Sequence, residues 1–448
     1  MNKAQTIPTV PLSRFLKHSL EILKNPLPFH HENFEKHGDT FKLKIGIKEE
    51  VIFSRDAKLT EYVLQKNHRN YTKSKIQTED LAKYVGKGLL TSEGDHWKKQ
   101  RKLIQPAFHK KQLDLLLESI KSAILQEYKT IKINESGDIF PMFNDLAFQT
   151  VVKSLFSSAA SKEQIDRLQY ITEAAQKMLV KELRQPYLIW WFKLSGKIKA
   201  YTDLTDEARQ ILRTMVKERR NSKSNYDDLL DMLLEAKYDD GNFMDEEQLI
   251  DEILILFSAG HETTSNALTF TAQLLALHPE WQESIYSEIV ELEANTTDLG
   301  GIVTKSKICQ QVIEESMRLY PPAYFIDRLN IEADEFNGMY LEKKSNLLFS
   351  VHEIHRNPEL WNDPDDFKPQ RFKEGSRKFS SQYFPFGAGP RKCIGSNFAM
   401  FEMIIAVREL VKGYKIKPHF DEIGITPLIT MKPKNAILRF EKRRVEKL

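Results

Sequence analysis

The spacing of apolar residues predicts helices over most of the first two thirds of the chain. Between residue 56 and about residue 292, apolar residues recur every three or four positions, which is the period of one helix face. The exception is the stretch 39–54, where Phe41 and Leu43, and later Val51 and Phe53, alternate with polar residues. This stretch is predicted to form the two strands of a hairpin. The helical segments are 56–67, 96–104, 110–128, 142–156, 163–183 and 203–220.

The longest predicted helix covers residues 244–279. It begins with acidic residues, which suit a helix N-terminus, and it stops at Pro279. Its length and apolar character place it in the centre of the protein. Further helices are expected at 307–320 and 398–414, with short strands and loops between them. Because no repeat or low-complexity linker interrupts the chain, we expect a mainly α fold with a minor β portion. A single domain over residues 1–448 with a short lead of about 30 residues is expected.

Charge and composition narrow the function. The chain carries 66 Lys and Arg against 63 Asp and Glu, without a dense basic block, so nucleic-acid binding is not expected. The first thirty residues are interrupted by prolines, lysines and histidines, and no run approaches the ~20 apolar residues of a membrane span. We therefore expect a cytoplasmic protein without a membrane anchor. The two cysteines, Cys309 and Cys393, lie in different contexts, which argues against a disulfide framework.

One of these cysteines stands in an unusual setting, the stretch FPFGAGPRKCIGSNFAM at 384–400. Cys393 follows two cations, Arg391 and Lys392, and precedes an apolar helix, so both the cations and the helix N-terminus favour the thiolate. Gly389 and Gly395 allow close approach of a flat, bulky group. A thiolate with no second ligand nearby suits haem iron better than zinc. By local chemistry alone, a buried and inert cysteine remains the alternative.

The stretch resembles the haem-binding signature of the cytochrome P-450 family, a pattern met by Phe386, Gly389, Arg391, Cys393 and Gly395. Three further signatures of the family precede it in the family's order, and together they span about two thirds of the chain. The resemblance implies the P-450 fold, with a long central helix over haem b. It also implies that Cys393 is the thiolate ligand, that Phe386 packs beside the ligand loop and that Arg391 faces a haem propionate.

The second signature is the run AGHETT at 259–264, in the middle of the long apolar helix. A solvent-facing turn would explain polar residues there, but the apolar neighbours on both sides disfavour it. Gly260 and the hydroxyl of Thr263 permit a local opening of the helix that would make room for O2 and a water. The resemblance counts Ala259 and Gly260 among the haem-binding residues. It also implies that the hydroxyl of Thr263 holds a water beside the iron and that Glu262 supplies protons.

The other two signatures concern arginines. Glu315 and Arg318 share a helix face, and the resemblance adds Arg371 to complete a structural triad that holds the cysteine loop. Trp97 and Arg101 stand four residues apart on another helix. The resemblance implies that this pair contacts a haem propionate, as does Arg328. Ordinary surface ion pairs are the alternative for each of these groups.

The substrate signals conflict. The segment 69–90 is rich in Lys, Gln and Thr, and Tyr324 and Asp327 flank an apolar strand, which favours a polar pocket. By the family's chemistry, such a pocket suits oxidative O-demethylation of a methoxylated sugar or aromatic compound, with release of formaldehyde, as in bacterial members. We favour this reading over an apolar pocket for a lipid, terpenoid or carotenoid. The apolar pocket would be walled by residues of a predicted helix at 176–191, namely Met178, Leu179, Tyr187, Ile189, Trp190 and Trp191.

Two other activities and the electron supply complete the expectations. A peroxide-driven haem-thiolate enzyme or a non-catalytic haem sensor would not need Glu262 and Thr263. The chain ends about fifty residues after Cys393 without a fused reductase, so we expect a separate ferredoxin and ferredoxin reductase as electron donors. A basic patch is expected to steer an acidic donor. The patch comprises Lys98, Lys99, Lys102 and Lys392.

Cys309 is expected to be without function.

Overall fold

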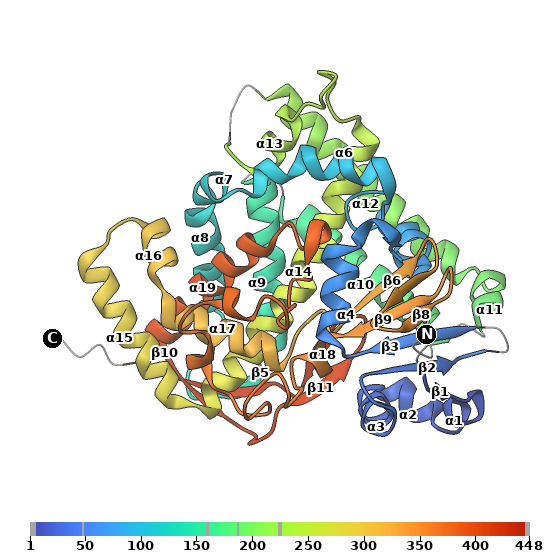
Figure 1. Ribbon diagram of the computed structural model, residues 1–448. Helices are drawn as coiled ribbons and strands as arrows, with labels where there is room; N and C mark the ends of the chain where they lie inside the picture. Colours follow the sequence, from blue (N-terminus) through green and yellow to red (C-terminus); the bar gives the residue numbers. More distant parts are fainter. Residues whose placement is uncertain (1–5, 47–48, 158–160, 186–187, 223–225, 444–448) are drawn as a thin grey trace. The chain divides into compact units, whose positions relative to one another are not determined.

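The computed structural model describes residues 6–46, 49–157, 161–185, 188–222 and 226–443 (Figure 1). The chain divides into two compact units. The first unit contains most of the β structure, and the second contains most of the helices. The first unit is Met1–Ser74, Gln311–Cys393 and Glu422–Asn435; the second is Lys75–Gln310, Ile394–Asp421 and Ala436–Leu448.

The first unit is built around a six-stranded sheet in the order β1-β2-β3-β9-β6-β4. The predicted hairpin is confirmed, because β2 and β3 pair antiparallel and bring Phe41 opposite Phe53. These two rings stack with their centroids 5.3 Å apart, in a core that also contains Phe34. The turn of the hairpin lies partly outside the described residues. The strands are β1 Thr9–Val10, β2 Thr40–Lys44, β3 Glu50–Ser54, β4 Tyr71–Thr72, β6 Phe325–Asn330 and β9 Asn346–Ser350.

Short helices and two small hairpins complete the first unit. The hairpins are β7 with β8 and β11 with β12, both antiparallel. A single-turn helix, α18, follows directly on β9 and leads towards the loops that hold the cysteine segment. The helices are α1 Leu12–Lys17, α2 Ser19–Lys24, α3 Leu27–His37, α4 Ala57–Glu61 and α18 Val351–Ile354; the hairpin strands are β7 Asp334–Phe336, β8 Met339–Leu341, β11 Gly424–Pro427 and β12 Met431–Lys434.

The second unit is helical, with one three-stranded sheet in the order β10-β13-β5. The helix predicted at 307–320 is α17 Lys307–Leu319, which begins in the second unit and ends in the first. The helices of the second unit are α5 Ala82–Val85, α6 Gly94–Ile104, α7 Lys110–Asp114, α8 Leu117–Tyr128, α9 Phe140–Phe156, α10 Lys162–Arg184, α11 Ile189–Leu194, α12 Lys197–Asn221, α13 Leu229–Glu235, α14 Glu246–Leu277, α15 Pro279–Asn295, α16 Leu299–Lys305 and α19 Ser396–Gly413; the strands are β5 Ser136–Asp138, β10 Tyr414–Pro418 and β13 Ile437–Lys442.

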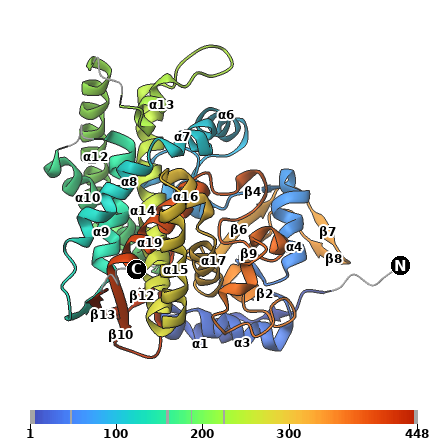
Figure 2. The same ribbon diagram turned by 90° about the vertical axis from the view of Figure 1, so that its left-hand side faces the viewer.

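The long helix α14 confirms the prediction from the sequence. Asp245 caps its N-terminus by accepting a hydrogen bond from the backbone N–H of Gln248 at 2.9 Å, and two glutamates occupy its first turn. Pro279 cannot continue the helix and instead begins α15. Most of α14 is buried, and it packs along α9, where Phe257 stacks on Phe148 (Figure 2). The mainly α fold with a minor β portion is therefore confirmed.

The predicted helix at 176–191 is wrong in its second half. Helix α10 ends at Arg184, and a separate short helix, α11, begins at Ile189. Met178 and Leu179 on α10 are buried, but Trp190 and Trp191 on α11 are 64% and 46% exposed. The tryptophans therefore do not wall an apolar pocket, and Tyr187 lies outside the described residues. Among the described residues, no helix is long and apolar enough to cross a membrane.

Candidate functional site

The cysteine segment forms a tight loop in front of α19. Cys393 lies three residues before the helix and is exposed. Its backbone N–H donates to the carbonyl of Phe386 at 2.9 Å, and that of Lys392 donates to the carbonyl of Gly389 at 3.0 Å. These two hydrogen bonds therefore fix the backbone of the loop at the cysteine. Cys309, by contrast, is buried, and burial raises the pKa of its thiol, which keeps it protonated.

Gly389 is required by the path of this loop. Its φ is +70°, and a Cβ atom placed on it would lie 1.9 Å from the carbonyl oxygen of Leu64. No side chain fits in that space, so the glycine allows the loop to contact the backbone after α4. At Gly395 a Cβ atom would meet nothing within 4 Å. The two glycines of the signature therefore differ, with one in close contact and the other beside open space.

A buried histidine, which the sequence reasoning missed, supports the start of the loop. The Nε2 atom of His355 accepts a hydrogen bond from the backbone N–H of Phe384 at 2.9 Å. The ring packs on that of Tyr383, with centroids 5.1 Å apart, and the hydroxyl of Tyr383 donates to the carbonyl of Glu314 at 2.7 Å. Burial lowers the pKa of His355 to about 3, so the ring is neutral and Nε2 is available as an acceptor.

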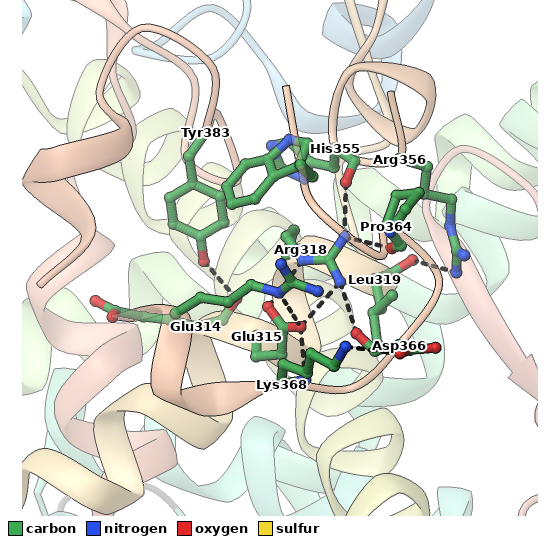
Figure 3. A network of polar contacts seen from close by, with 12 residues as sticks. Glu314, Glu315, Arg318, Leu319, His355, Arg356, Pro364, Asp366, Lys368 and Tyr383 are labelled. Atoms are coloured by element: carbon green, nitrogen blue, oxygen red, sulfur yellow. Dashed lines mark hydrogen bonds and ion pairs between the residues drawn. The ribbon is translucent and has the colours of Figure 1, made fainter. Parts of the chain in front are cut away.

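The three residues of the predicted triad are in contact. Figure 3 shows Arg318 beside Glu315. Arg318 holds Glu315 through two hydrogen bonds of 2.8 and 2.9 Å, and both side chains are fully buried. Arg371 approaches the same carboxylate at 3.2 Å, and the backbone N–H of Lys368 donates to it at 2.9 Å. The carboxylate is thus surrounded by donors from two segments about fifty residues apart, as a buried charge requires.

Arg318 also binds the loop segments through their backbone. It donates to the carbonyl oxygens of His355 at 2.8 Å, Pro364 at 2.6 Å and Asp366 at 3.0 Å (Figure 3). Its guanidinium lies over the ring of Trp361, 5.3 Å from the centroid. One arginine therefore positions the whole stretch that leads from α18 towards the cysteine loop. The sequence pattern indicated the ion pair but gave no signal for these carbonyl contacts.

The strand β6 positions Arg328, another arginine of the predicted site. Arg328 is 8% exposed, stands opposite Leu347 of β9, and donates to the carbonyl of Asp327 at 2.7 Å. Arg391 is half-buried in the cysteine loop. Arg328 is thus a permanently charged side chain that is held on a sheet and slightly exposed, which suits the binding of a carboxylate.

In the second unit, α6 carries Trp97 and Arg101 on one face, both half-buried. The Nε of Arg101 donates to Gln105 at 3.1 Å. Two lysines of the predicted basic patch are bound to acids of the same unit, Lys98 to Asp95 and Lys102 to Asp239; the distances are 3.0 and 2.7 Å. These two ion pairs partly neutralise the positive charge that α6 presents.

The polar residues of α14 lie in the second unit as well. Thr263 is half-buried, and its hydroxyl donates to the carbonyl of Ala259 at 2.7 Å, while Glu262 is 7% exposed. A Cβ atom on Gly260 would lie 3.1 Å from a methyl group of Val151 on α9, so the glycine allows the two helices to pack closely. Thr263 uses its hydrogen in the helix and keeps its oxygen available as an acceptor.

Comparison with known proteins decides the family. A family model described as Cytochrome P-450 matches residues 8–440, nearly the whole chain. The chain belongs to the cytochrome P-450 family. It is therefore a haem b-binding monooxygenase. This class replaces the two alternatives, a peroxide-driven haem-thiolate enzyme and a non-catalytic haem sensor.

Relatives and solved structures agree with this assignment. The chain is 27% identical to the cyclooctat-9-en-7-ol 5-monooxygenase of Streptomyces melanosporofaciens, over 92% of this chain and 88% of the relative. It is 28% identical to the 11-oxo-beta-amyrin 30-oxidase of Medicago truncatula, over 91% of this chain and 81% of the relative. The crystal structure of the cytochrome P-450DA haem domain matches with a TM-score of 0.85 at 21% identity, covering 98% of each chain, which shows the fold.

The residues around Cys393 fit the haem of a P-450. The thiol is exposed, it precedes a helix N-terminus, and the space beside Gly395 is open. A thiolate is one of the established axial donors of haem iron, and a buried Arg328 suits a propionate. Cys309 differs because its thiol is fully buried against the carbonyl of Ile404.

The second unit of this P-450 contains a narrow cavity beside α14. It holds about 20 Å³, which is room for a water molecule. Leu254 and Ser258 contribute from α14, and most of the other lining groups are apolar. The lining is completed by Leu81, Tyr84, Val85, Ile171, Thr172, Ala175, Gln176, Leu179, Thr205 and Ala208.

The polar groups next to this cavity bind each other. The carboxylate of Glu182 on α10 is 4% exposed and accepts a short hydrogen bond from the hydroxyl of Tyr84. Lys83 binds the same carboxylate at 2.5 Å. Burial and the carboxylate raise the pKa of Tyr84, so the hydroxyl stays protonated and remains a donor. This contact joins α5 to α10 across 98 residues of sequence, and no sequence signal predicted it.

A larger hollow of about 360 Å³ lies in the second unit, between α7, α8 and α16. It is lined by charges of both signs, including Lys110, Asp114 and Asp298. None of the predicted site residues lines it, so its size does not make it the haem or substrate site.

Proposed function

We propose that this P-450 hydroxylates an apolar substrate of the terpenoid class, with Cys393 as the thiolate ligand of its haem. The observation that carries the proposal is that two side chains counted in favour of a polar pocket, Tyr324 and Asp327, already have hydrogen-bond partners within the protein. The surroundings of α14 are mostly apolar as well, with Leu179, Ile171 and Leu254 around a cavity that has room for a water molecule.

Two polar side chains that favoured O-demethylation, Tyr324 and Asp327, are already bound within the protein. Tyr84, which lies in the segment 69–90, donates to Glu182. In the first unit, Tyr324 donates to the carbonyl of Leu428 at 2.5 Å, and Asp327 accepts from the backbone N–H of Ser74 at 3.1 Å. A polar substrate would have to displace these partners, which costs about 1–3 kcal/mol for each buried group left unsatisfied. A hydrocarbon substrate leaves all of them in place.

The relatives support the same choice. One is named as a monooxygenase of cyclooctat-9-en-7-ol and another as an oxidase of 11-oxo-beta-amyrin, both terpenoid skeletons. Their identity to this chain, below 30%, supports a class of substrate and not a particular compound.

The residues of this chain divide the chemistry among them. The haem, when bound, supplies the activation of O2. Cys393 would hold the iron through its sulfur, and a thiolate ligand would favour O–O cleavage. Arg328, Arg391 and Arg101 provide fixed positive charge for the propionates, and the indole of Trp97 adds one N–H donor.

Proton delivery is assigned to α14. Thr263 donates its hydroxyl hydrogen to Ala259, so its Oγ1 accepts a hydrogen bond from a water and orients it. Glu262 is buried except for a small exposed part, through which its carboxylate exchanges protons with solvent. Gly260 lets α14 pack closely against Val151 of α9.

A matched pair of variants tests the role of Thr263. Thr271 on the same helix donates to the carbonyl of Ala267 at 2.7 Å, the same geometry, but is fully buried. We expect Thr263→Ala to consume O2 and reductant with little product, whereas Thr271→Ala keeps the wild-type ratio of product to O2. Equal coupling in both variants would remove Thr263 from the proton path.

Separate electron donors remain part of the proposal, with a ferredoxin and its reductase as the expected pair. Because Lys98 and Lys102 are bound to acids, the attraction of an acidic donor rests on fewer charges than the sequence indicated. Reconstitution with a ferredoxin and its reductase should support turnover that falls with rising salt.

The substrate class is tested by the shift of the Soret band on binding. We expect a shift with diterpene and triterpene alcohols and none with methoxylated sugars or methoxylated aromatic compounds of similar concentration. Formaldehyde is measured in the same turnover mixtures. A shift confined to the methoxylated compounds, with formaldehyde formed in proportion to the O2 consumed, would replace terpenoid hydroxylation by O-demethylation.

A further inference from the structure

Two neighbouring carboxylates of α14 bind the loop 86–92, which joins α5 to α6. The Oδ2 atom of Asp251 accepts a hydrogen bond from the backbone N–H of Lys87 at 2.7 Å. The Oε2 atom of Glu252 accepts one from the backbone N–H of Leu89 at 3.0 Å. The two carboxylates therefore fix the backbone of a loop that lies 164 and 163 residues away from them in the sequence.

Further hydrogen bonds bind the same loop. Gln248, one turn earlier on α14, donates to the carbonyl of Lys87 at 2.8 Å. Within the loop, the hydroxyl of Thr91 donates to the carbonyl of Gly86 at 2.7 Å and accepts from the backbone N–H of Gly88 at 3.0 Å. The loop is thus held from α14 and from within, and α6 begins two residues after it.

The two glycines of the loop allow the carboxylates to lie this close to its backbone. A Cβ atom on Gly88 would lie 2.6 Å from the carboxyl group of Glu252, whose side chain is fully buried and has little room to move. A Cβ atom on Gly86, where φ is +80°, would overlap the carboxylate of Asp251. The sequence therefore provides both the acceptors on α14 and the space for them in the loop.

Asp251 also binds an arginine of α12. Its Oδ1 atom accepts a hydrogen bond from Arg209. The side chains of Arg209 and Asp251 are only 17% and 15% exposed, so salt and water screen this ion pair less than a surface pair. One oxygen of the carboxylate is thus bound to α12 and the other to the backbone of Lys87. Asp251 therefore joins α12 and α14 to the loop in front of α6.

We propose that Asp251 and Glu252 are positioning residues for the haem, and that they act by placing α6. The inference rests on the proposed contact of Trp97 and Arg101 with a haem propionate. Because α6 begins at Gly94, a shift of the loop moves the first turn of the helix and Trp97 with it. Side chains that bind a cofactor depend on the groups that orient them, and here those groups are two carboxylates of α14.

The rate of haem transfer from the full-length holoprotein to apomyoglobin tests the proposal. A carboxamide has one acceptor oxygen where a carboxylate has two, so Glu252→Gln leaves the N–H of Leu89 or of Gln248 without its acceptor. We expect Glu252→Gln and Asp251→Asn each to lose haem about tenfold faster than the wild type. Arg209→Gln should lose haem about threefold faster, and Arg209→Lys, which keeps the charge, should restore most of the retention.

Asp228 provides the matched control, because it repeats the arrangement of Asp251 elsewhere on α12. It is 1% exposed, binds Arg219 of α12 and accepts a backbone N–H of α13, the helix it caps, at 3.0 Å. Asp228→Asn should lower the stability to urea as Asp251→Asn does, but change the rate of haem loss by less than about twofold. Hydrogen exchange should become faster at residues 86–104 in Asp251→Asn and at residues 226–235 in Asp228→Asn.

Arg101→Gln separates this proposal from the haem contact on which it rests. If α6 transmits the effect, Glu252→Gln should add little haem loss once Arg101 is replaced, because both changes weaken the same contact. Wild-type retention in Glu252→Gln and Asp251→Asn, beside fast loss in Arg101→Gln, would overturn the positioning role alone, as would equally fast loss in Asp228→Asn. Wild-type retention in Arg101→Gln would remove the haem contact and the proposal with it, and fully additive effects would exclude α6 as the route.

Discussion

Replacement of Arg318 by lysine removes the fixed geometry on which the cysteine loop depends, while it retains the charge. Arg318 makes five hydrogen bonds, two to the carboxylate of Glu315 and three to backbone carbonyls (Figure 3). An ammonium group has three hydrogens on one atom, so at least two of the five acceptors lose their donor. Both side chains of the ion pair are fully buried, and water cannot take the donor's place without rearrangement.

The expected cost follows from these contacts. Each buried acceptor left without a donor costs about 1–3 kcal/mol, so Arg318→Lys should lower the free energy of unfolding by about 2–6 kcal/mol. Because the total stability of a domain is about 5–15 kcal/mol, this is a large fraction of it. The loop segments at Pro364 and Asp366 lose their common anchor, so the variant should also hold haem less well.

Urea unfolding, followed by circular dichroism and by the Soret band in parallel, measures both effects. Arg220→Lys is the control, because the side chains of Arg220 and of its partner Glu246 are 44% and 41% exposed. An exposed pair contributes about 0–1 kcal/mol, and the control should change little. If Arg318→Lys costs no more than the control, the buried network does not position the cysteine loop in the way described.

Three further predictions follow from single contacts. Gly389→Ala forces a Cβ atom against the carbonyl of Leu64 and should lower the haem content of the purified protein severalfold, whereas Gly413→Ala, whose Cβ atom meets nothing within 4 Å, should not. Tyr84→Phe removes a hydrogen bond to the buried carboxylate of Glu182, which joins α5 to α10, and should cost about 1–3 kcal/mol in urea unfolding; an unchanged free energy of unfolding would contradict this role. The pKa of His355 is about 3 in the folded protein, below the 6.5 of the unfolded chain, so its contribution to stability is complete above pH 6.5 and falls by up to about 1.4 kcal/mol per pH unit as the pH drops towards 3. The free energy of unfolding, measured between pH 7.5 and 4.5, should depend less steeply on pH in His355→Gln. An unchanged dependence on pH would contradict a neutral, buried His355.

The sequence predicted the elements whose periodicity is local and strong. Helix α14 was found from its acidic start, its apolar run and Pro279, all of which act within the helix itself. The β2–β3 hairpin was likewise predicted from a pattern within the segment itself, the alternation of apolar and polar residues. The contact of Glu315 with Arg371 spans 56 residues and was predicted only through the resemblance to the family, because i and i+3 spacing alone cannot distinguish a buried pair from a surface pair.

What the sequence could not predict depends on long-range packing. The role of His355 rests on a backbone N–H 29 residues away, and the pairing of Tyr84 with Glu182 rests on how α5 meets α10. The helix that was wrongly extended to Trp191 contains Pro186, a signal against a continuous helix that the apolar pattern outweighed. Exposure of the tryptophans follows from that break, since α11 buries Phe192 in their place.

The central claim, that Cys393 is the thiolate ligand of the haem, is tested most directly by the absorption spectrum of the reduced protein under carbon monoxide. The wild type should show the strongly red-shifted Soret band of a thiolate-ligated haem, and Cys393→His should lose it while Cys309→Ser keeps it. A red-shifted band that persists in Cys393→His, or that is absent from the wild type with haem bound, would contradict the assignment of Cys393 and the proposed use of its sulfur in O–O cleavage.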